Sequence, residues 1–239
     1  MPPTTQSSFF PVQCNRTRPK PPAAVDCDFV AVCDASTERY LCKGQSRIAH
    51  LPATEWICST LARDIGLPVP PFAVVELTTN PGVFLFGSQW LGGAVDYMVG
   101  LPHVSNPELF SRVFGMDWVS HNDDRHFGNY LYLVINGEVI LRPMDFSRAW
   151  LHHGWPLPGL PLPKCFTTDN KPIWEAMHGY TPPLATIDKV TSLADDWMLN
   201  TLEAMPAVWV TPQQRSDLIA WWTSPARQSR VTLAKSTLP

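Results

Sequence analysis

The feature that most constrains this chain is an Asn-Gly pair, at residues 136–137, between two strand-like runs. Tyr130–Ile135 and Glu138–Arg142 are rich in apolar and β-branched residues. An Asn-Gly pair between such runs is the strongest short-range signal for a two-residue β-hairpin. With that turn, Asn129 lies opposite Met144, about 5 Å away across the ladder. The hairpin therefore brings the residues before its first strand next to those after its second.

Polar side chains gather at the end of this predicted hairpin. Asp124, Asn129 and Asp145 supply two carboxylates and an amide oxygen, hard ligands of the kind that Mg²⁺ prefers. Phosphoryl transfer uses this set: one carboxylate orients the acceptor hydroxyl, while the other and the Asn hold Mg²⁺ on the nucleotide phosphates. The residues alone leave a second interpretation open, in which Asp124, Arg125 and His126 form a structural hydrogen-bond network that closes a turn.

Spacing by itself is weak evidence for such a site. An Asp followed five residues later by an Asn occurs at 117/122, 124/129 and 195/200. The last pair falls inside a predicted helix, where the spacing is a coincidence. The middle pair is distinguished by its loop position, by the hairpin that follows and by the second Asp at the hairpin's exit.

The first half of the chain is predicted to be mainly β. Phe29–Cys33 and Arg39–Lys43 read as a hairpin with a four- or five-residue loop. A helix follows from about Pro52 to Ile65, where Gly66 ends it. Further apolar stretches, Phe72–Leu77 and Val83–Gly87, then precede a helix that begins at Asn106-Pro107 and reaches about residue 120.

The second half is predicted to be mainly helical. Residues 154–183 are rich in Gly and Pro and show no period, so we expect a long functional or mobile loop. An apolar stripe from Ile187 to Leu202 predicts a helix, and Thr211 with Gln214 forms a capping box for a last one. The order favours an α+β chain with two lobes: an extended Pro-rich lead-in over 1–25, a small β-rich N-lobe over 26–92 and a mainly helical C-lobe over 93–239.

Composition excludes several classes of protein. The 239 residues carry a net charge of −3 without any basic run, which argues against binding nucleic acid through its phosphates. No stretch approaches the roughly 18 to 20 apolar residues of a membrane span, and the N-terminus lacks a secretory pattern. The six cysteines include no Cys-x-x-Cys pair, which is typical of buried thiols in a reducing compartment. We therefore expect a cytoplasmic protein.

The motifs around the hairpin resemble a known superfamily. Asp-Arg-His-x-x-Asn, then a short hairpin and Met-Asp-Phe, is similar to the catalytic and metal-binding loops of protein-kinase-like enzymes, in the variant found in HipA-like kinases and, more distantly, in phosphoinositide kinases. The upstream run from Glu55, ending in Gly-Leu-Pro-Val-Pro, also resembles the compact HipA-like form. The resemblance extends from about Phe29 to Trp150.

The resemblance implies a role for each matching residue. Asp124 is the implied catalytic Asp, and Asn129 and Asp145 are the implied Mg²⁺ ligands. Lys43 matches the lysine that pairs with the phosphates of ATP, and Glu55 matches the acid that orients this lysine. The run at residues 83–87 matches the link between lobes that lines the adenine pocket. An isolated Lys and Glu usually face water, but Lys43 ends an apolar strand.

The chain departs from the family pattern at three points. No Gly-rich loop precedes the lysine, so the turn at residues 34–37 would cradle phosphate through its backbone and through Ser36 and Thr37. Ser147 stands where the protein-kinase triplet has glycine. The chain is also much shorter than full HipA toxins, so it is either a minimal kinase or one whose regulatory protein partner supplies missing parts.

The resemblance therefore predicts an ATP- and Mg²⁺-dependent kinase of the HipA-like serine/threonine type. The acceptor is a protein or a small molecule, and no membrane or nucleic-acid partner is expected. The alternative is a non-catalytic kinase-like scaffold that acts as a binding module, which the missing Gly-rich loop favours. A third possibility is an unrelated α+β domain in which the hairpin motif is a coincidence.

Two further features concern regulation and metal binding. Ser147, Thr167 and Thr168 follow the metal-binding Asp, where kinases keep a regulatory loop, so they are candidates for autophosphorylation by position. His152 and His153 are adjacent, and on an extended segment their side chains point in opposite directions. We therefore do not expect these two histidines to share a metal ion.

Overall fold

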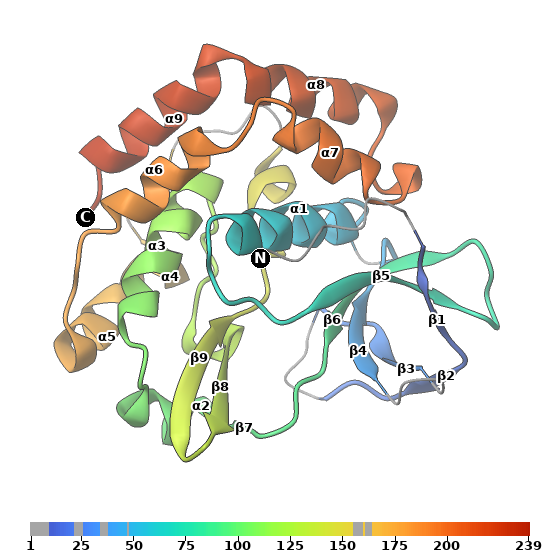
Figure 1. The fold of residues 1–239 in the computed structure, drawn as a ribbon, viewed down its shortest axis with the longest axis horizontal. Coiled ribbons are helices and arrows are strands. Elements are labelled where there is room, and N and C mark those ends of the chain that lie inside the picture. The colour runs from blue at the N-terminus through green and yellow to red at the C-terminus, as the bar shows by residue number, and fades with distance from the viewer. Residues whose placement is uncertain (1–9, 22–25, 34–37, 47, 155–159, 161–163) are drawn as a thin grey trace.

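The computed structural model separates into a β-rich lobe and a mainly helical lobe, with helix α1 between them (Figure 1). The structure describes residues 10–21, 26–33, 38–46, 48–154, 160 and 164–239. The predicted two-lobed α+β architecture is therefore confirmed. Ser36 and Thr37, the expected phosphate-binding residues of the first turn, lie outside the described residues.

The strands form two sheets. Their bounds are β1 (Val12–Cys14), β2 (Arg16–Arg18), β3 (Phe29–Val32), β4 (Arg39–Lys43), β5 (Phe72–Leu77), β6 (Phe84–Gln89), β7 (Ala94–Val95), β8 (Tyr130–Ile135) and β9 (Glu138–Pro143). The first sheet has the order β1-β5-β6-β4-β3-β2 and the second the order β7-β8-β9. The predicted hairpins β3–β4 and β8–β9 are both present as antiparallel pairs.

The first sheet curls until its two edges nearly meet. β1 and β2 stand at opposite ends of the strand order, although only Asn15 separates them along the chain. β1 pairs parallel with β5, whereas β2 pairs antiparallel with β3. The curled sheet encloses a core of its own, which consists of Cys14, Ala31, Cys33, Tyr40, Cys42, Val75 and Leu85.

The described part of the expected lead-in therefore belongs to the N-lobe sheet. Residues 10–21 supply both edge strands of the sheet, β1 and β2. β1 pairs with backbone groups of β5, and β2 pairs with those of β3, which would otherwise lie at open edges. Residues 1–9 and 22–25 lie outside the described residues.

A second correction concerns Val83–Gly87, which we expected to link the lobes. Most of this run belongs to β6, in the middle of the sheet between β5 and β4. The link is instead the segment 90–93, which leads from β6 to β7. Gly87 is needed in β6, because a Cβ there would lie 2.5 Å from Cγ2 of Val75.

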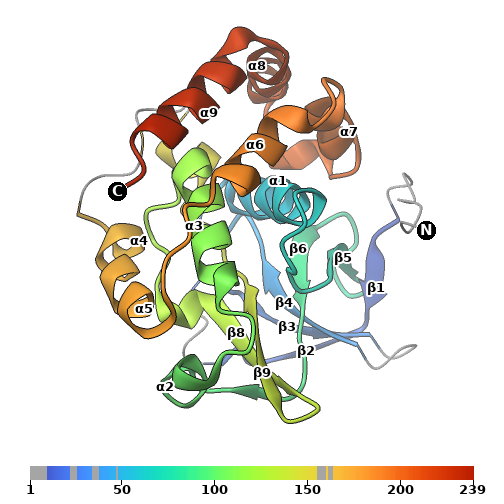
Figure 2. The same cartoon turned by 60° about the vertical axis from the view of Figure 1, so that its left-hand side comes forward.

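The helices cover the second sheet and enclose α1. Their bounds are α1 (Leu51–Asp64), α2 (Tyr97–Gly100), α3 (Glu108–Ser120), α4 (Phe166–Asp169), α5 (Lys171–His178), α6 (Leu184–Ser192), α7 (Trp197–Glu203), α8 (Pro212–Thr223) and α9 (Pro225–Ser236). Short 3₁₀ turns occur at Leu101–His103, Phe127–Asn129, Trp150–His153 and Ala207–Trp209. Figure 2 shows α3 running beside α6 and α9, with α4 and α5 at its other side.

Helix α1 begins and ends within one residue of its prediction. Pro52 occupies the first turn, and Gly66, with φ of 83°, follows the helix end at Ile65. Arg63 and Asp64 are exposed, but the rest of the helix is buried or nearly so. A helix buried on almost all sides belongs to the core, so α1 is a fixed support for the side chains that it carries.

Two predictions for the second half are wrong in part. The stretch 154–183, expected to be a loop, contains α4 and α5. The stripe from Ile187 to Leu202 is split between α6 and α7, because Leu193 adopts an extended backbone. Arg227 donates to the Leu193 carbonyl over 3.1 Å and Trp222 to the Ala194 carbonyl over 3.0 Å, which satisfies the groups that the break leaves.

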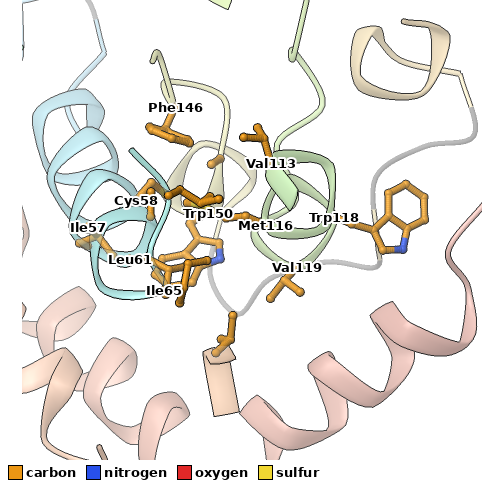
Figure 3. Close-up of a cluster of buried hydrophobic side chains, with 14 of the residues drawn as sticks. Ile57, Cys58, Leu61, Ile65, Val113, Met116, Trp118, Val119, Phe146 and Trp150 are labelled. Carbon is orange, nitrogen blue, oxygen red and sulfur yellow. The ribbon is translucent and has the colours of Figure 1, made fainter. Parts of the chain in front are cut away.

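The main core lies where α1, α3 and the chain after β9 meet (Figure 3). Phe146 and Trp150 are both buried and project from that chain. Trp150 lies between Leu61 of α1 and Met116 of α3, and Phe146 lies nearer to Cys58 and Val113. This packing fixes the segment that begins at Asp145. No helix within the described ranges is both long and apolar enough to cross a membrane.

Candidate active site

The β8–β9 hairpin forms with the predicted register. Tyr130 lies opposite Pro143, and the turn residues 136–137 have φ values of 53° and 85°, as a type I′ turn requires. The N–H of Met144 donates to the carbonyl of Asn129 over 3.0 Å. The residues on both sides of the hairpin are therefore held together at one end.

Lys43, Glu55 and Asp145 meet at this end, although they come from three different elements. Lys43 ends β4, Glu55 lies on α1, and Asp145 follows β9. The Nζ atom of Lys43 is 2.5 Å from Oε1 of Glu55 and 2.8 Å from Oδ1 of Asp145. Lys43 and Glu55 are only 5% and 2% exposed. Lys43 is therefore buried and paired, and it does not face water as an isolated lysine at the end of a strand usually does.

The three charges control one another. Burial alone would lower the pKa of Lys43, but Asp145 and Glu55 outweigh it and raise that pKa. Burial would raise the pKa of Asp145, but the ammonium of Lys43 holds it well below its usual range. Burial raises the pKa of Glu55 from 4.5 to about 7, against the opposing pull of Lys43. Lys43 and Asp145 are therefore charged at neutral pH, and Glu55 is the more easily protonated of the two carboxylates.

Backbone groups complete this ion-pair cluster. The N–H of Phe146 donates to both carboxylate oxygens of Glu55, at 3.2 Å each. Asp145 has φ of 59°, a left-handed conformation that is uncommon outside glycine, and its Oδ1 accepts from the N–H of Ser147 at 3.2 Å. The Ser147 hydroxyl donates to Oδ2 of Asp26 at 3.0 Å. The segment after β9 is thus tied to both α1 and the N-lobe.

Asp124 and Asn129 form the second half of the site. The Asn129 side-chain amide donates to the backbone carbonyl of Asp124 over 2.8 Å. Neither the Asp124 carboxylate nor the Asn129 amide oxygen makes a hydrogen bond or ion pair within the described ranges of the chain. Burial raises the pKa of Asp124, and the guanidinium of Arg148 is among the nearby groups that oppose that rise. Both oxygen groups are thus available to a ligand.

Arg125, a buried arginine, holds the loop in place. The sequence alone indicated only that it could belong to a hydrogen-bond network that closes a turn. Arg125 donates through Nε and Nη2 to the two carboxylate oxygens of Asp117, at 2.8 and 3.0 Å. Its Nη1 donates to the carbonyl of Asn129 at 2.9 Å and also to the carbonyl of Met144. One guanidinium therefore joins α3, the loop before β8 and the exit of β9.

The 117/122 pair is part of the same network. Asn122 donates to Oδ1 of Asp117 over 2.8 Å, so this Asp-Asn spacing has a structural use. Asp117 lies on the inward stripe of α3 with Phe110 and Phe114, and it is fully buried. A carboxylate on an apolar helical stripe is the sequence signal that would have revealed a buried cationic partner.

Thr167 braces the same loop. Its hydroxyl accepts from the N–H of Arg125 at 3.0 Å and donates to the carbonyl of Asn122 at 2.6 Å. It is 1% exposed, so in this conformation it is not open to the phosphorylation that its position suggested. His126 has a local structural role, since its Nδ1 accepts from the N–H of Gly128 at 3.1 Å.

The donor set fits a hard divalent cation. The Asn129 amide oxygen and the Asp145 carboxylate are oxygen ligands at adjacent ends of β8 and β9, and Mg²⁺ prefers such ligands. Lys43 pairs with Asp145 over 2.8 Å, so its positive charge lies beside one of these oxygen ligands. The arrangement can thus hold a metal and a phosphate chain side by side, with Asp124 nearby to accept a hydrogen bond from a hydroxyl.

A comparison with solved structures identifies the class of fold. The structure is similar to that of the Helicobacter pylori proinflammatory kinase CtkA, with a TM-score of 0.64 over 97% of this chain and 100% of that one, at 11% sequence identity. The molecule therefore has a two-lobed protein-kinase-like fold.

Part of the sequence is similar to the HipA-like kinases. Residues 29–138 match the family model of HipA-like kinases, and the resemblance inferred from the motifs is thereby confirmed. HipA of Shewanella oneidensis MR-1, solved with HipB and operator DNA, matches with a TM-score of 0.47 and 10% identity. That match covers 84% of this chain but 58% of HipA, so the chain spans less than two thirds of its length. Among curated proteins, none matches the sequence.

Proposed function

We propose that this kinase-like protein transfers the γ-phosphoryl group of ATP, in the presence of Mg²⁺, to an alcohol acceptor. The observation that carries the proposal is the ion-pair cluster of Lys43 with Glu55 and Asp145, at 2.5 and 2.8 Å. A buried lysine between two carboxylates has lost its water, and a structural role alone is better served by apolar side chains of the same volume.

Each residue has a part in the proposed reaction. Lys43, oriented by Glu55, pairs with the nucleotide phosphates, and Asn129 and Asp145 hold Mg²⁺. The cation neutralises charge on the phosphates. Asp124 accepts the hydrogen bond of the acceptor hydroxyl and directs its oxygen toward the γ-phosphorus. Catalysis of this kind consists mainly of positioning and charge stabilisation.

The acceptor class follows from the resemblance to HipA-like kinases, which favours a serine or threonine of a protein. A small-molecule alcohol is the competing acceptor. All six cysteines are free thiols, which supports a reducing compartment and hence a cytoplasmic location. Ser36 and Thr37 of the first turn are proposed to contact phosphate in place of a Gly-rich loop.

The second candidate is a kinase-like scaffold without catalysis. It is favoured by the absence of glycine from the turn at residues 34–37. The charged and amide side chains of the site argue against a scaffold. A scaffold has no use for a buried lysine paired with two carboxylates, or for an Asp124 carboxylate that has no partner among the described residues.

The test compares nucleotide binding with phosphoryl transfer in four proteins. Mg-ATP binding is measured by calorimetry with and without EDTA, and transfer from radiolabelled ATP to protein and to small alcohols is measured beside it. The variants are Asp145→Asn, Asp124→Asn and, as a matched control, Asp195→Asn, whose carboxylate is an exposed surface group paired with Arg227.

We expect wild-type protein and Asp195→Asn to bind Mg-ATP and transfer phosphate. Asp145→Asn should lose Mg²⁺-dependent binding, and Asp124→Asn should bind nucleotide but transfer at least about 100-fold more slowly. Mg-ATP binding without transfer in the wild type would favour the scaffold. Failure of the wild type to bind nucleotide would contradict the proposed kinase and favour the non-catalytic scaffold.

A further inference from the structure

A histidine-rich cluster lies beside the candidate active site. His121 ends α3 with φ of 57° and is 6% exposed. Its ring lies 4.1 Å, centroid to centroid, from that of His153, and Nε2 of His153 is 3.8 Å from Oδ2 of Asp123. One potential ligand atom from each of these three residues lies within 4.8 Å of the other two.

The hydrogen bond of His153 leaves one ring nitrogen for a ligand. Its Nε2 lies 2.7 Å from the backbone carbonyl of Arg148. Because a carbonyl only accepts, Nε2 carries a proton, and in the neutral ring Nδ1 keeps its lone pair. Histidines that bind metals typically donate their other ring N–H to a carbonyl or carboxylate, which fixes the ring. His153 is held in this way.

Two orphaned nitrogen atoms adjoin the cluster. The ring of His152 is 5.1 Å from that of His153, and the ring of His50 is 5.8 Å from that of His152. Nδ1 of His152 and Nε2 of His50 are buried and have no hydrogen-bond partner among the described residues. Because Arg148 can only donate, Nε2 of His152 accepts and Nδ1 carries the proton, so water is the partner that would satisfy Nδ1. His152 is itself not a ligand, because its Nε2 faces Nη1 of Arg148 at 3.2 Å.

We propose that His121, Asp123 and His153 bind a first-row transition-metal cation, for which Zn²⁺ is the best fit. Two imidazoles and a carboxylate suit Zn²⁺ and leave a fourth position for water. Ligands of one tetrahedral Zn²⁺, bound at about 2.0–2.2 Å, lie about 3.3 Å apart, so three atoms that lie within 4.8 Å of one another need to close by up to about 1.5 Å. The Mg²⁺ proposed at Asn129 and Asp145 is a separate ion with oxygen ligands.

A metal ion bound there would fix the position of the loop that carries Asp124. The three ligands come from the end of α3, from the residue preceding Asp124 and from the 3₁₀ turn that follows β9. A bound ion would tie these three segments together. Its proposed role is therefore positional, and the binding itself is independent of phosphoryl transfer.

The test titrates the full chain, freed of metal with EDTA, with ZnCl₂ in the presence of excess Mg²⁺ by calorimetry. Co²⁺ serves as a second probe, because its visible absorption reports the coordination geometry and distinguishes nitrogen and oxygen ligands from thiolates. The variants are His153→Ala and Asp123→Asn. The matched controls are His103→Ala, which removes an exposed histidine outside the cluster, and Cys165→Ser, which removes the least buried thiol.

The expected result is one Zn²⁺ per chain, with affinity at least tenfold weaker in His153→Ala and Asp123→Asn and unchanged in both controls. Thermal unfolding of each metal-free variant checks that it folds, and the isosteric Asp123→Asn carries the test if His153→Ala does not. Absence of saturable Zn²⁺ binding, or equal binding by wild type and cluster variants, overturns the proposal, as does loss of binding in Cys165→Ser. No nucleotide is present, so a failed kinase assay leaves this result intact.

Discussion

Replacing Arg125 with methionine should destabilise the folded state more than any surface change. The substitution keeps the volume of the side chain but removes the donors to Asp117, at 2.8 and 3.0 Å, and to the carbonyls of Asn129 and Met144. Asp117 is fully buried and would keep only its hydrogen bond from Asn122.

The expected magnitude follows from that uncompensated charge. Breaking a buried ion pair by removing one partner costs about 3–5 kcal/mol. At about 2–4 °C per kcal/mol for a chain of this size, the unfolding temperature should fall by roughly 6–20 °C. Since Arg125 also positions the Asn129 backbone, phosphoryl transfer should fall even where the variant remains folded.

Thermal and urea unfolding at neutral pH measure this effect. The control is Arg215→Met, because Arg215 is a partly exposed arginine with one backbone hydrogen bond and a distant Glu203, and its loss should cost no more than about 1 kcal/mol. The double variant Arg125→Met with Asp117→Asn should recover about 1–3 kcal/mol relative to the sum of the single changes. A cost below about 1 kcal/mol for Arg125→Met, or strict additivity in the double variant, would refute the reasoning.

Three further predictions concern the site and the N-lobe. Because the pKa of Glu55 is raised in the folded chain, its contribution to stability is full below pH 4.5 and is lost as pH rises through about 7. Mg-ATP affinity should instead weaken below pH 7, as Glu55 is protonated. Calorimetry on Glu55→Gln should show a flatter dependence of Mg-ATP affinity on pH. Thr167→Val leaves two buried backbone groups unpaired and should cost about 1–3 kcal/mol in urea unfolding, with slower transfer; an unchanged midpoint would contradict the brace. Gly87→Ala forces a Cβ to 2.5 Å from Val75 and should cost about 1–3 kcal/mol, part of which Val75→Ala should restore.

The elements that were predictable have strong local signals. The Asn-Gly turn at 136–137 determines its hairpin and register, and Gly66 ends α1 where the apolar period stops. The order of Lys43, Glu55 and the motif from Asp124 onward was enough to predict the fold class, because a family motif concentrates long-range information in a few positions.

The edge strands β1 and β2 were not predictable in this way. Each is three residues long, and their pairing depends on strands far away in the sequence rather than on a local period. The same holds for α4 and α5, which are short helices whose partners lie elsewhere in the chain. Arg125 belongs to this group as well, because its role becomes visible only once the inward face of α3 places Asp117 opposite it.

The direction in which two of the proposed site side chains point depends on backbone conformation, which sequence patterns do not report. His121 and Asp145 both have left-handed backbone conformations, with φ of 57° and 59°, which few non-glycine residues adopt. A pattern therefore predicts for each an ordinary helix end or extended segment. At Asp145 the conformation accompanies contacts of its carboxylate with Lys43 and of the next N–H with Glu55. At His121 it ends α3 where the ring meets that of His153. Such conformations cost free energy and persist where surrounding contacts impose them, so the two positions mark where the fold gives up local preference for site geometry.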